Sequence, residues 1–74
     1  MAEGKTEYRT MSREEQLELR WKADNRDQPD ALFEGQRIIG FREWKSSSLY
    51  APGQWCVSCV LEDGTRLIID EGKG

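Results

Sequence analysis

The residues of this chain that could do chemistry are two cysteines and several adjacent pairs of carboxylates. Cys56 and Cys59 have the Cys-x-x-Cys spacing of many zinc and redox sites, and acids adjoin each other at 14–15, 62–63 and 70–71. A zinc knuckle needs a second ligand pair, but the sequence has no histidine and no third cysteine. Without an imidazole, a serine or cysteine nucleophile also lacks its usual base. We therefore expect no catalytic residue, no metal site, no cofactor and no enzymatic activity.

The two cysteines are predicted to be free thiols. They lie three residues apart in a segment with the apolar, β-branched pattern of a strand. Their side chains then point to opposite faces, with Cα atoms about 10 Å apart by the rise of a strand. A disulfide requires a separation below about 7 Å. We expect both thiols to be buried or half-buried.

A second group of residues is suited to binding. Residues 36–60 contain three cationic side chains, Arg37, Arg42 and Lys45, and one acidic side chain, Glu43. The same stretch contains four aromatic residues: Phe41, Trp44, Tyr50 and Trp55. Rings beside cations on a β-surface can stack the bases of a single-stranded nucleic acid. The whole chain has a net charge of −3, however, whereas nucleic-acid binding favours a concentrated basic footprint. Core packing is the competing interpretation of Trp44 and Trp55.

The segment that positions the cysteines, residues 54–70, is predicted to be a β-hairpin. A two-residue turn at Asp63-Gly64 would split its apolar residues between both faces. A three-residue loop with Gly64 in the left-handed region pairs Leu61 with Thr65 and gathers them on one face: Val57, Cys59, Leu61, Leu67 and Ile69. Core burial selects this bulged register, because a one-residue slip would turn over the whole set. The opposite face is mixed: Cys56, Ser58, Val60, Arg66, Ile68 and Asp70.

Residues 13–24 give two conflicting signals. Ser12 and Glu15 have the spacing of a capping box, and the residues that follow are mostly good helix formers. Yet the apolar residues at 17, 19, 21 and 23 alternate strictly with charged ones, which is typical of a half-buried strand. We predict a helix, whose two apolar stripes would need cover on two sides. The alternative, with residues 16–24 as a strand, predicts a small all-β sheet or an SH3-like barrel.

The remaining segments complete a single small α+β domain over residues 12–71. Residues 1–11 are polar and lack periodicity, so we expect a flexible tail, and residues 72–74 should be frayed. Ala31 to Phe33 is predicted to be an apolar anchor of one helical turn. Residues 36–44 should form a strand with Gly40 bulged or closely approached by another backbone. The predicted fold is one N-terminal helix packed on a three-stranded antiparallel β-meander.

The loop from Lys45 to Gln54 is the best candidate for a specific contact. Hairpin loops usually have two to five residues, and this longer one places Leu49 and Tyr50 among serines and a Pro52-Gly53 turn. The two side chains either fold back as a lid on the core or project toward a partner. The candidate partner-binding residues are Leu49, Tyr50, Trp44, Trp55, Arg42 and Lys45.

These features predict a small non-enzymatic protein-interaction or regulatory accessory protein. No apolar run approaches the roughly 18 residues of a membrane span, and the first residues lack the pattern of a signal peptide, so we expect a cytoplasmic location without membrane contact. Its size and composition are typical of a bacterial or phage accessory factor. The partner is an unknown protein or a second copy of the chain. The alternative function is a single-stranded nucleic-acid-binding module that uses Trp44, Tyr50 and Trp55 with nearby arginine and lysine.

Overall fold

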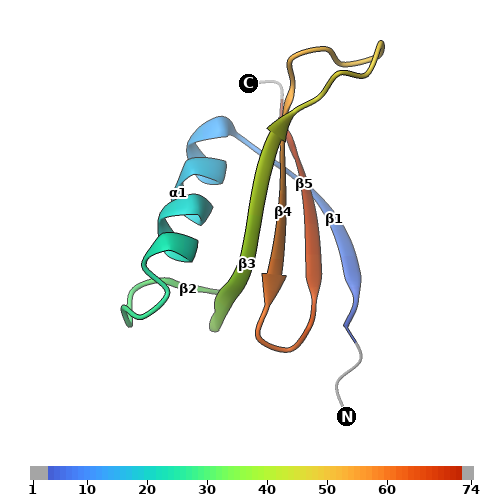
Figure 1. Ribbon diagram of the computed structural model, residues 1–74. Helices are drawn as coiled ribbons and strands as arrows, with labels where there is room; N and C mark the ends of the chain where they lie inside the picture. Colours follow the sequence, from blue (N-terminus) through green and yellow to red (C-terminus); the bar gives the residue numbers. More distant parts are fainter. Residues whose placement is uncertain (1–3, 73–74) are drawn as a thin grey trace.

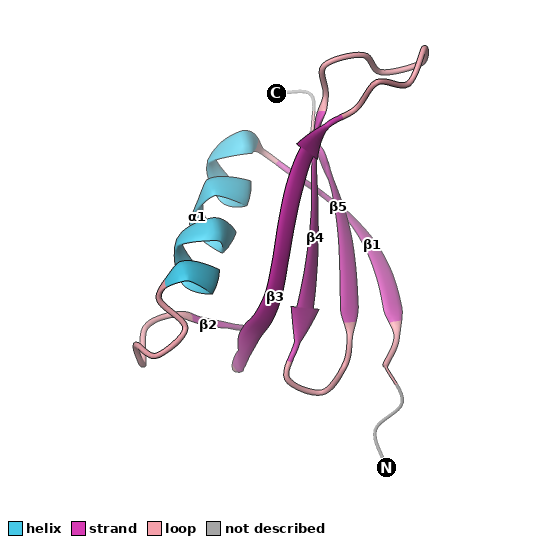
Figure 2. Cartoon of the chain, viewed as in Figure 1, coloured by secondary structure: helices cyan, strands magenta, loops and turns pink. Residues whose placement is uncertain are grey.

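The computed structural model describes residues 4–72, which form one helix and a five-stranded mixed sheet (Figures 1 and 2). The elements in chain order are β1 (Thr6–Met11), α1 (Arg13–Asp24), β2 (Leu32–Phe33), β3 (Gln36–Lys45), β4 (Trp55–Leu61) and β5 (Arg66–Glu71). The strand order is β1-β5-β4-β3-β2, in which β1 is parallel to β5 and the other neighbours are antiparallel. The sheet curls into a half-barrel, and α1 packs on one of its faces. The predicted α+β class is confirmed.

The helix begins where its capping box predicted. The Ser12 hydroxyl accepts the Glu15 amide at 3.2 Å, and the Ser12 amide donates to the Glu15 carboxylate at 3.0 Å. This reciprocal pair satisfies two of the donors that a helix start leaves open. The strand alternative for residues 16–24 is therefore wrong. The alternating apolar residues divide between two sides of the helix, with Leu19 and Ala23 buried and Leu17 and Trp21 exposed.

The hairpin of β4 and β5 has the bulged register that core burial selects. The Leu61 amide donates to the Thr65 carbonyl at 2.8 Å, and Gly64 closes the turn with a φ of 91°. This φ favours glycine, because a side chain would strain the left-handed backbone. All five residues predicted to line one face are buried: Val57, Cys59, Leu61, Leu67 and Ile69.

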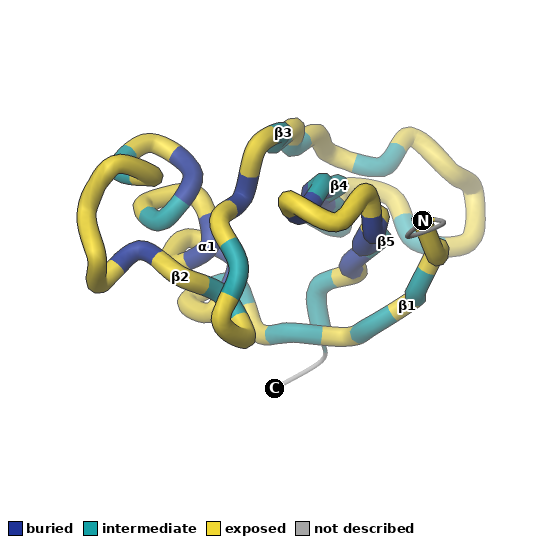
Figure 3. Tube along the Cα trace, turned by 90° about the horizontal axis from the view of Figure 1, so that it is seen from below, coloured by how far each residue is buried: buried dark blue, intermediate teal, exposed yellow. Residues whose placement is uncertain are grey.

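These five residues define the inner face of the sheet, which packs against Leu19 and Ala23 of α1. Ile38 of β3 completes the buried cluster, and Phe41 packs partly against it. Figure 3 shows buried positions on α1 and the central strands, whereas β1 has only intermediate and exposed positions. We call the opposite side of the sheet the outer face. Within residues 4–72, no helix or strand covers it.

The expected three-stranded meander is corrected to five strands, and the largest difference is β1. Residues 6–11, expected to belong to a flexible tail, pair in parallel with β5. Backbone hydrogen bonds hold this strand, including one from the Arg66 amide to the Lys5 carbonyl at 2.6 Å. Gly72, expected to be frayed, likewise donates to the Met11 carbonyl at 2.7 Å. Residues 1–3 and 73–74 of the two expected ends lie outside the described residues.

The fifth strand, β2, replaces the helical turn that we expected at Ala31 to Phe33. Glu34 and Gly35 both have positive φ, 53° and 81°, which is the backbone of a tight type I′ hairpin turn. Phe33 therefore pairs back onto Gln36. In β3, the register shifts between Ile38 and Gly40, which confirms the predicted irregularity at this glycine.

Candidate functional site

The two cysteines are free, as predicted, and lie on opposite faces of β4. Cys59 is buried on the inner face, where burial raises the pKa of its thiol to about 11. Cys56 lies on the outer face with its Sγ 3.6 Å from Asp70 Oδ1, and burial together with this carboxylate raises its pKa above the ordinary value. Both thiols stay protonated near neutral pH, so they are poor nucleophiles. Over residues 4–72, no three potential metal-ligating side chains come together.

The adjacent carboxylates serve the backbone of the fold. Glu62 accepts the Arg37 amide at 3.0 Å, and Glu71 accepts the Trp55 amide at 3.2 Å. Asp63 accepts the Thr65 amide at 2.9 Å, and its hydrogen bonds to Thr65 lower the pKa of its carboxyl group. Each of these acids thus fixes a strand end or a turn.

The structure separates the two tryptophans that flank the long loop. Trp44 pairs with Cys56 on the outer face, whereas Trp55 pairs with Lys45 and lies on the inner side of the sheet. The Arg13 guanidinium lies 3.8 Å from the centre of the Trp55 ring, and Lys45 Nζ lies at 5.2 Å. Trp55 therefore packs between the helix start and the end of β3. The grouping of Trp44, Tyr50 and Trp55 proposed for stacking bases does not share one surface.

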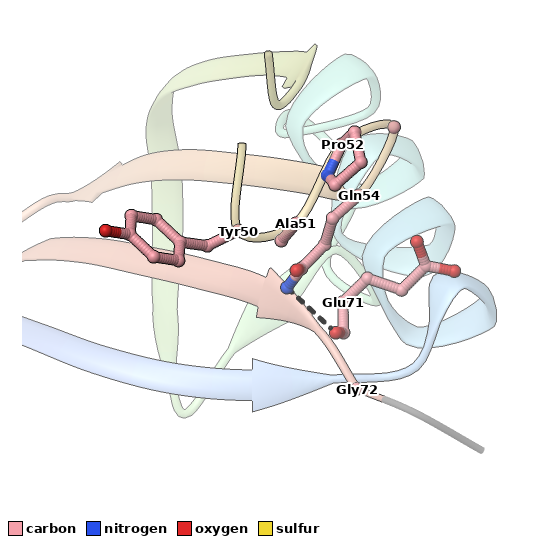
Figure 4. Close-up of a pocket in the computed structure, with 7 residues that line it drawn as sticks. Tyr50, Ala51, Pro52, Gln54, Glu71 and Gly72 are labelled. Atoms are coloured by element: carbon pink, nitrogen blue, oxygen red, sulfur yellow. Dashed lines mark hydrogen bonds between the residues drawn. The ribbon is translucent and has the colours of Figure 1, made fainter. Parts of the chain in front are cut away.

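The loop between β3 and β4 projects its two large side chains into solvent. Leu49 is 95% exposed and Tyr50 is 98% exposed. Figure 4 shows the Tyr50 ring pointing away from Gln54 and Glu71, which line the hollow at the base of the loop. The two side chains therefore do not form a lid on the core.

Hydrogen bonds hold this loop in a defined shape. The Ser46 amide donates to the Gln54 carbonyl at 2.7 Å, and the Gly53 amide donates to the Ser46 carbonyl at 2.9 Å. The hydroxyl of Ser46 accepts the Ser48 amide, and that of Ser48 accepts the Tyr50 amide, each at 3.1 Å. At the base, Gln54 Nε2 donates to the Glu71 carbonyl at 3.1 Å (Figure 4). The serine hydroxyls thus order the path of the loop.

The arginines differ between the two faces of the sheet. Arg13 and Arg20 of α1 both pair with Glu43, at 3.1 Å and 3.0 Å. Arg9 pairs with Glu7 and Glu34, each at 2.9 Å, and the Arg9 hydrogen bonds lower the pKa of Glu34. These ion pairs join β1, α1, β2 and β3 around the core.

On the outer face, Arg42 and Arg66 form no ion pair with any residue between 4 and 72. Their strand partners are Ser58 and Val60. Arg42 lies 5.6 Å from the centre of the Trp44 ring, and Trp44 is 37% exposed. Tyr8, on the same face, is 77% exposed. Sequence reasoning missed Tyr8. Residues 6–11 lack the alternation of apolar and polar residues that would predict a strand, and Tyr8 is placed on the sheet only by the parallel pairing of β1 with β5.

Comparisons of the chain with protein-family models, with curated proteins and with solved structures found no match. Between residues 4 and 72, the chain has no helix that is long and apolar enough to cross a membrane.

Proposed function

We propose that this chain is a non-enzymatic protein-interaction module that engages a partner protein through the loop between β3 and β4. The observation that supports this most is the exposure of Leu49 and Tyr50, at 95% and 98%, on a hydrogen-bonded loop. Tyrosine offers a large, rigid contact surface with a polar tip, and it is enriched among residues that dominate binding energy. The proposal includes a regulatory accessory role, in which the module modulates a larger partner.

The order of the loop favours binding, because a preformed loop loses less conformational entropy when a partner immobilises it. The amides of Ser46, Ser48 and Tyr50 all donate within the loop or across its base. The two longest strands of the sheet support the loop, so its tip is held well away from the core. An apolar pocket on the partner would then receive Leu49 and the Tyr50 ring.

The test compares the proteins that the wild-type chain retains from lysate of its host with those retained by Tyr50→Ala and Leu49→Ala. Tyr8→Ala is the matched control, since it removes an exposed tyrosine from a different surface. A partner that engages the loop is lost with both loop variants and retained by the control. With the purified partner, each loop variant should lose about 1–4 kcal/mol of binding free energy.

Circular dichroism and thermal melting must show that both loop variants fold as the wild type does. If all four proteins retain the same partners with equal affinity, the loop is not the contact surface and the proposal fails. Light scattering of the purified chain identifies self-association, in which case the partner is a second copy and the same variants should abolish the dimer.

A further inference from the structure

The outer face of the sheet presents a second, independent surface that has both aromatic rings and cations without an ion-pair partner among residues 4–72. The strand register places Tyr8, Ile68, Ser58 and Arg42 in one row across β1, β5, β4 and β3. The next row toward the long loop contains Thr10, Asp70, Cys56 and Trp44. In the other direction lies the row of Thr6, Arg66, Val60 and Gly40. The two aromatic residues thus lie on the two flanking strands of this surface, and the central strands between them contribute Ile68, Ser58, Cys56 and Asp70.

We propose that this face binds a short stretch of single-stranded nucleic acid, with bases stacked on Tyr8 and Trp44 and phosphates contacted by Arg42 and Arg66. Base stacking on aromatic rings tolerates any sequence, since every base has a π-face. Strands spaced about 4.8 Å apart and a rise of about 3.3 Å per residue place the two aromatic positions roughly 16 Å apart. Bases of one strand, not a single nucleotide, are therefore needed to reach both.

Charge complementarity favours a polyanion as the occupant. The chain as a whole has a net charge of −3, but the outer-face rows contain Arg42 and Arg66 against Asp70 alone. Elsewhere, Arg9, Arg13 and Arg20 are neutralised by carboxylates within 3.1 Å. The same charges make a second copy an unfavourable occupant, because two outer faces placed against each other would bring these arginines together.

A single strand fits this surface better than a duplex does. Two arginines neutralise few phosphates, whereas duplex binding relies on many such contacts for its affinity. Splayed bases of a single strand can instead use the exposed rings of Tyr8 and Trp44. Ser58 and Cys56, which lie between the two rings on β4, keep the surface there low, which allows the backbone of the strand to approach. The resulting site is weak, salt-dependent and tolerant of sequence.

The test is fluorescence anisotropy of a labelled oligothymidylate of about twelve nucleotides, within the usual site size of a single-strand-binding domain. Wild-type protein should bind at about 50 mM salt and weaken toward about 200 mM, with a log–log slope of roughly −1.4 for two phosphate contacts. Tyr8→Ala and Trp44→Ala should each weaken binding by about fivefold to a hundredfold. Arg66→Gln should reduce the size of the slope by about 0.7.

Two controls separate this site from others. Arg20→Gln removes an arginine of α1 that pairs with Glu43, and Tyr50→Ala removes the exposed tyrosine of the loop. Neither should change the affinity for the oligonucleotide, so this result is independent of the loop-binding test. Absence of binding by the wild-type protein at low salt overturns the proposal. The proposal also fails if Arg20→Gln weakens binding of the oligonucleotide as much as Arg66→Gln does. Equal binding of a polyglutamate of matched charge would also overturn it and indicate an acidic protein segment.

Discussion

The inner and outer faces of the sheet differ in how their side chains are used. On the inner face, the apolar residues of β4 and β5 are buried against α1, and the arginines that border it are paired with carboxylates. On the outer face, Arg42 and Arg66 are unpaired with any described residue, and Tyr8 is largely exposed. The sheet thus contributes to the hydrophobic core through its inner face alone. The residues of the other face are therefore available for binding, and each prediction below tests this division.

The largest effect should come from two neighbouring isoleucines of β5 that point to opposite faces. Ile69 is fully buried in the core cluster, whereas Ile68 lies on the uncovered outer face. Ile69→Ala should lower the free energy of unfolding by about 2–5 kcal/mol through lost burial and a cavity. Ile68→Ala should cost about 1 kcal/mol or less, because water already reaches this side chain. Urea denaturation followed by circular dichroism measures both.

Equal losses for the two variants would contradict the comparison. They would mean that another molecule buries Ile68 in solution, and the cost of Ile68→Ala would then depend on protein concentration. Light scattering over the same concentration range would separate this case from a simple error in the face assignment.

The two isoleucines also show how far the sequence predicts this fold. Burial of a continuous apolar set fixed the register of β4 and β5, so Ile69 and Leu67 were assigned to the core correctly. The capping box of Ser12 and Glu15 resolved the helix against a misleading alternation. Both signals are local, acting within a few residues of the turn or the helix start.

The parts that could not be predicted depend on contacts between distant residues. The place of β1 follows from backbone pairing with β5, at the far end of the chain, and its alternating side chains are mostly polar. Trp44 and Trp55 are separated onto two faces by the register of β3 against β4, which the long loop between these strands leaves open in the sequence. Consequently, the candidate site predicted around these tryptophans contained Arg42 and Trp44 but lacked Tyr8.

A second pair of variants tests the charges of the two faces. Glu43 accepts hydrogen bonds from Arg13 and Arg20, which tie α1 to β3, and Asp70 forms no ion pair with any residue from 4 to 72. Glu43→Gln should therefore lower the free energy of unfolding by about 1–2 kcal/mol, given that the two pairs are partly exposed. Asp70→Asn should leave it within about 0.5 kcal/mol of the wild type. Thermal and urea unfolding at neutral pH measure the difference, and similar costs for both would refute a difference in charge pairing.

The two cysteines give a third comparison, through pH. Because burial raises the pKa of Cys59 from its ordinary value of 9.0 to about 11, the folded state keeps this proton where the unfolded chain loses it. The contribution of this thiol to the free energy of unfolding is fully present below about pH 9 and is lost as the pH rises toward 11. At pH 10 the free energy of unfolding is lower by about 1 kcal/mol. Cys59→Val should remove this part of the alkaline loss.

Cys56→Ser is the matched control on the outer face, where the pKa is also raised but by burial of a less enclosed thiol and by Asp70. Melting temperatures of the three proteins between pH 8 and pH 11 measure the effect, and the comparison of slopes cancels the alkaline effects that the three proteins share. The smaller change in slope should belong to Cys56→Ser. A larger change for this variant would reverse the assignment of the more buried thiol.

The smallest effect on stability should come from Tyr8, although it lies in β1, a strand that was not predicted from the sequence. Backbone hydrogen bonds to β5 and the ion pairs of Arg9 hold β1, while the Tyr8 ring is 77% exposed. Tyr8→Ala should therefore change the free energy of unfolding by no more than about 0.5 kcal/mol. Arg9→Gln, at the adjacent position on the other face, should cost more, because it removes contacts to both Glu7 and Glu34. If Tyr8→Ala lowers the free energy of unfolding by more than about 1.5 kcal/mol, the ring holds β1 against β5. The role of Tyr8 would then be structural, and it would not be available for binding.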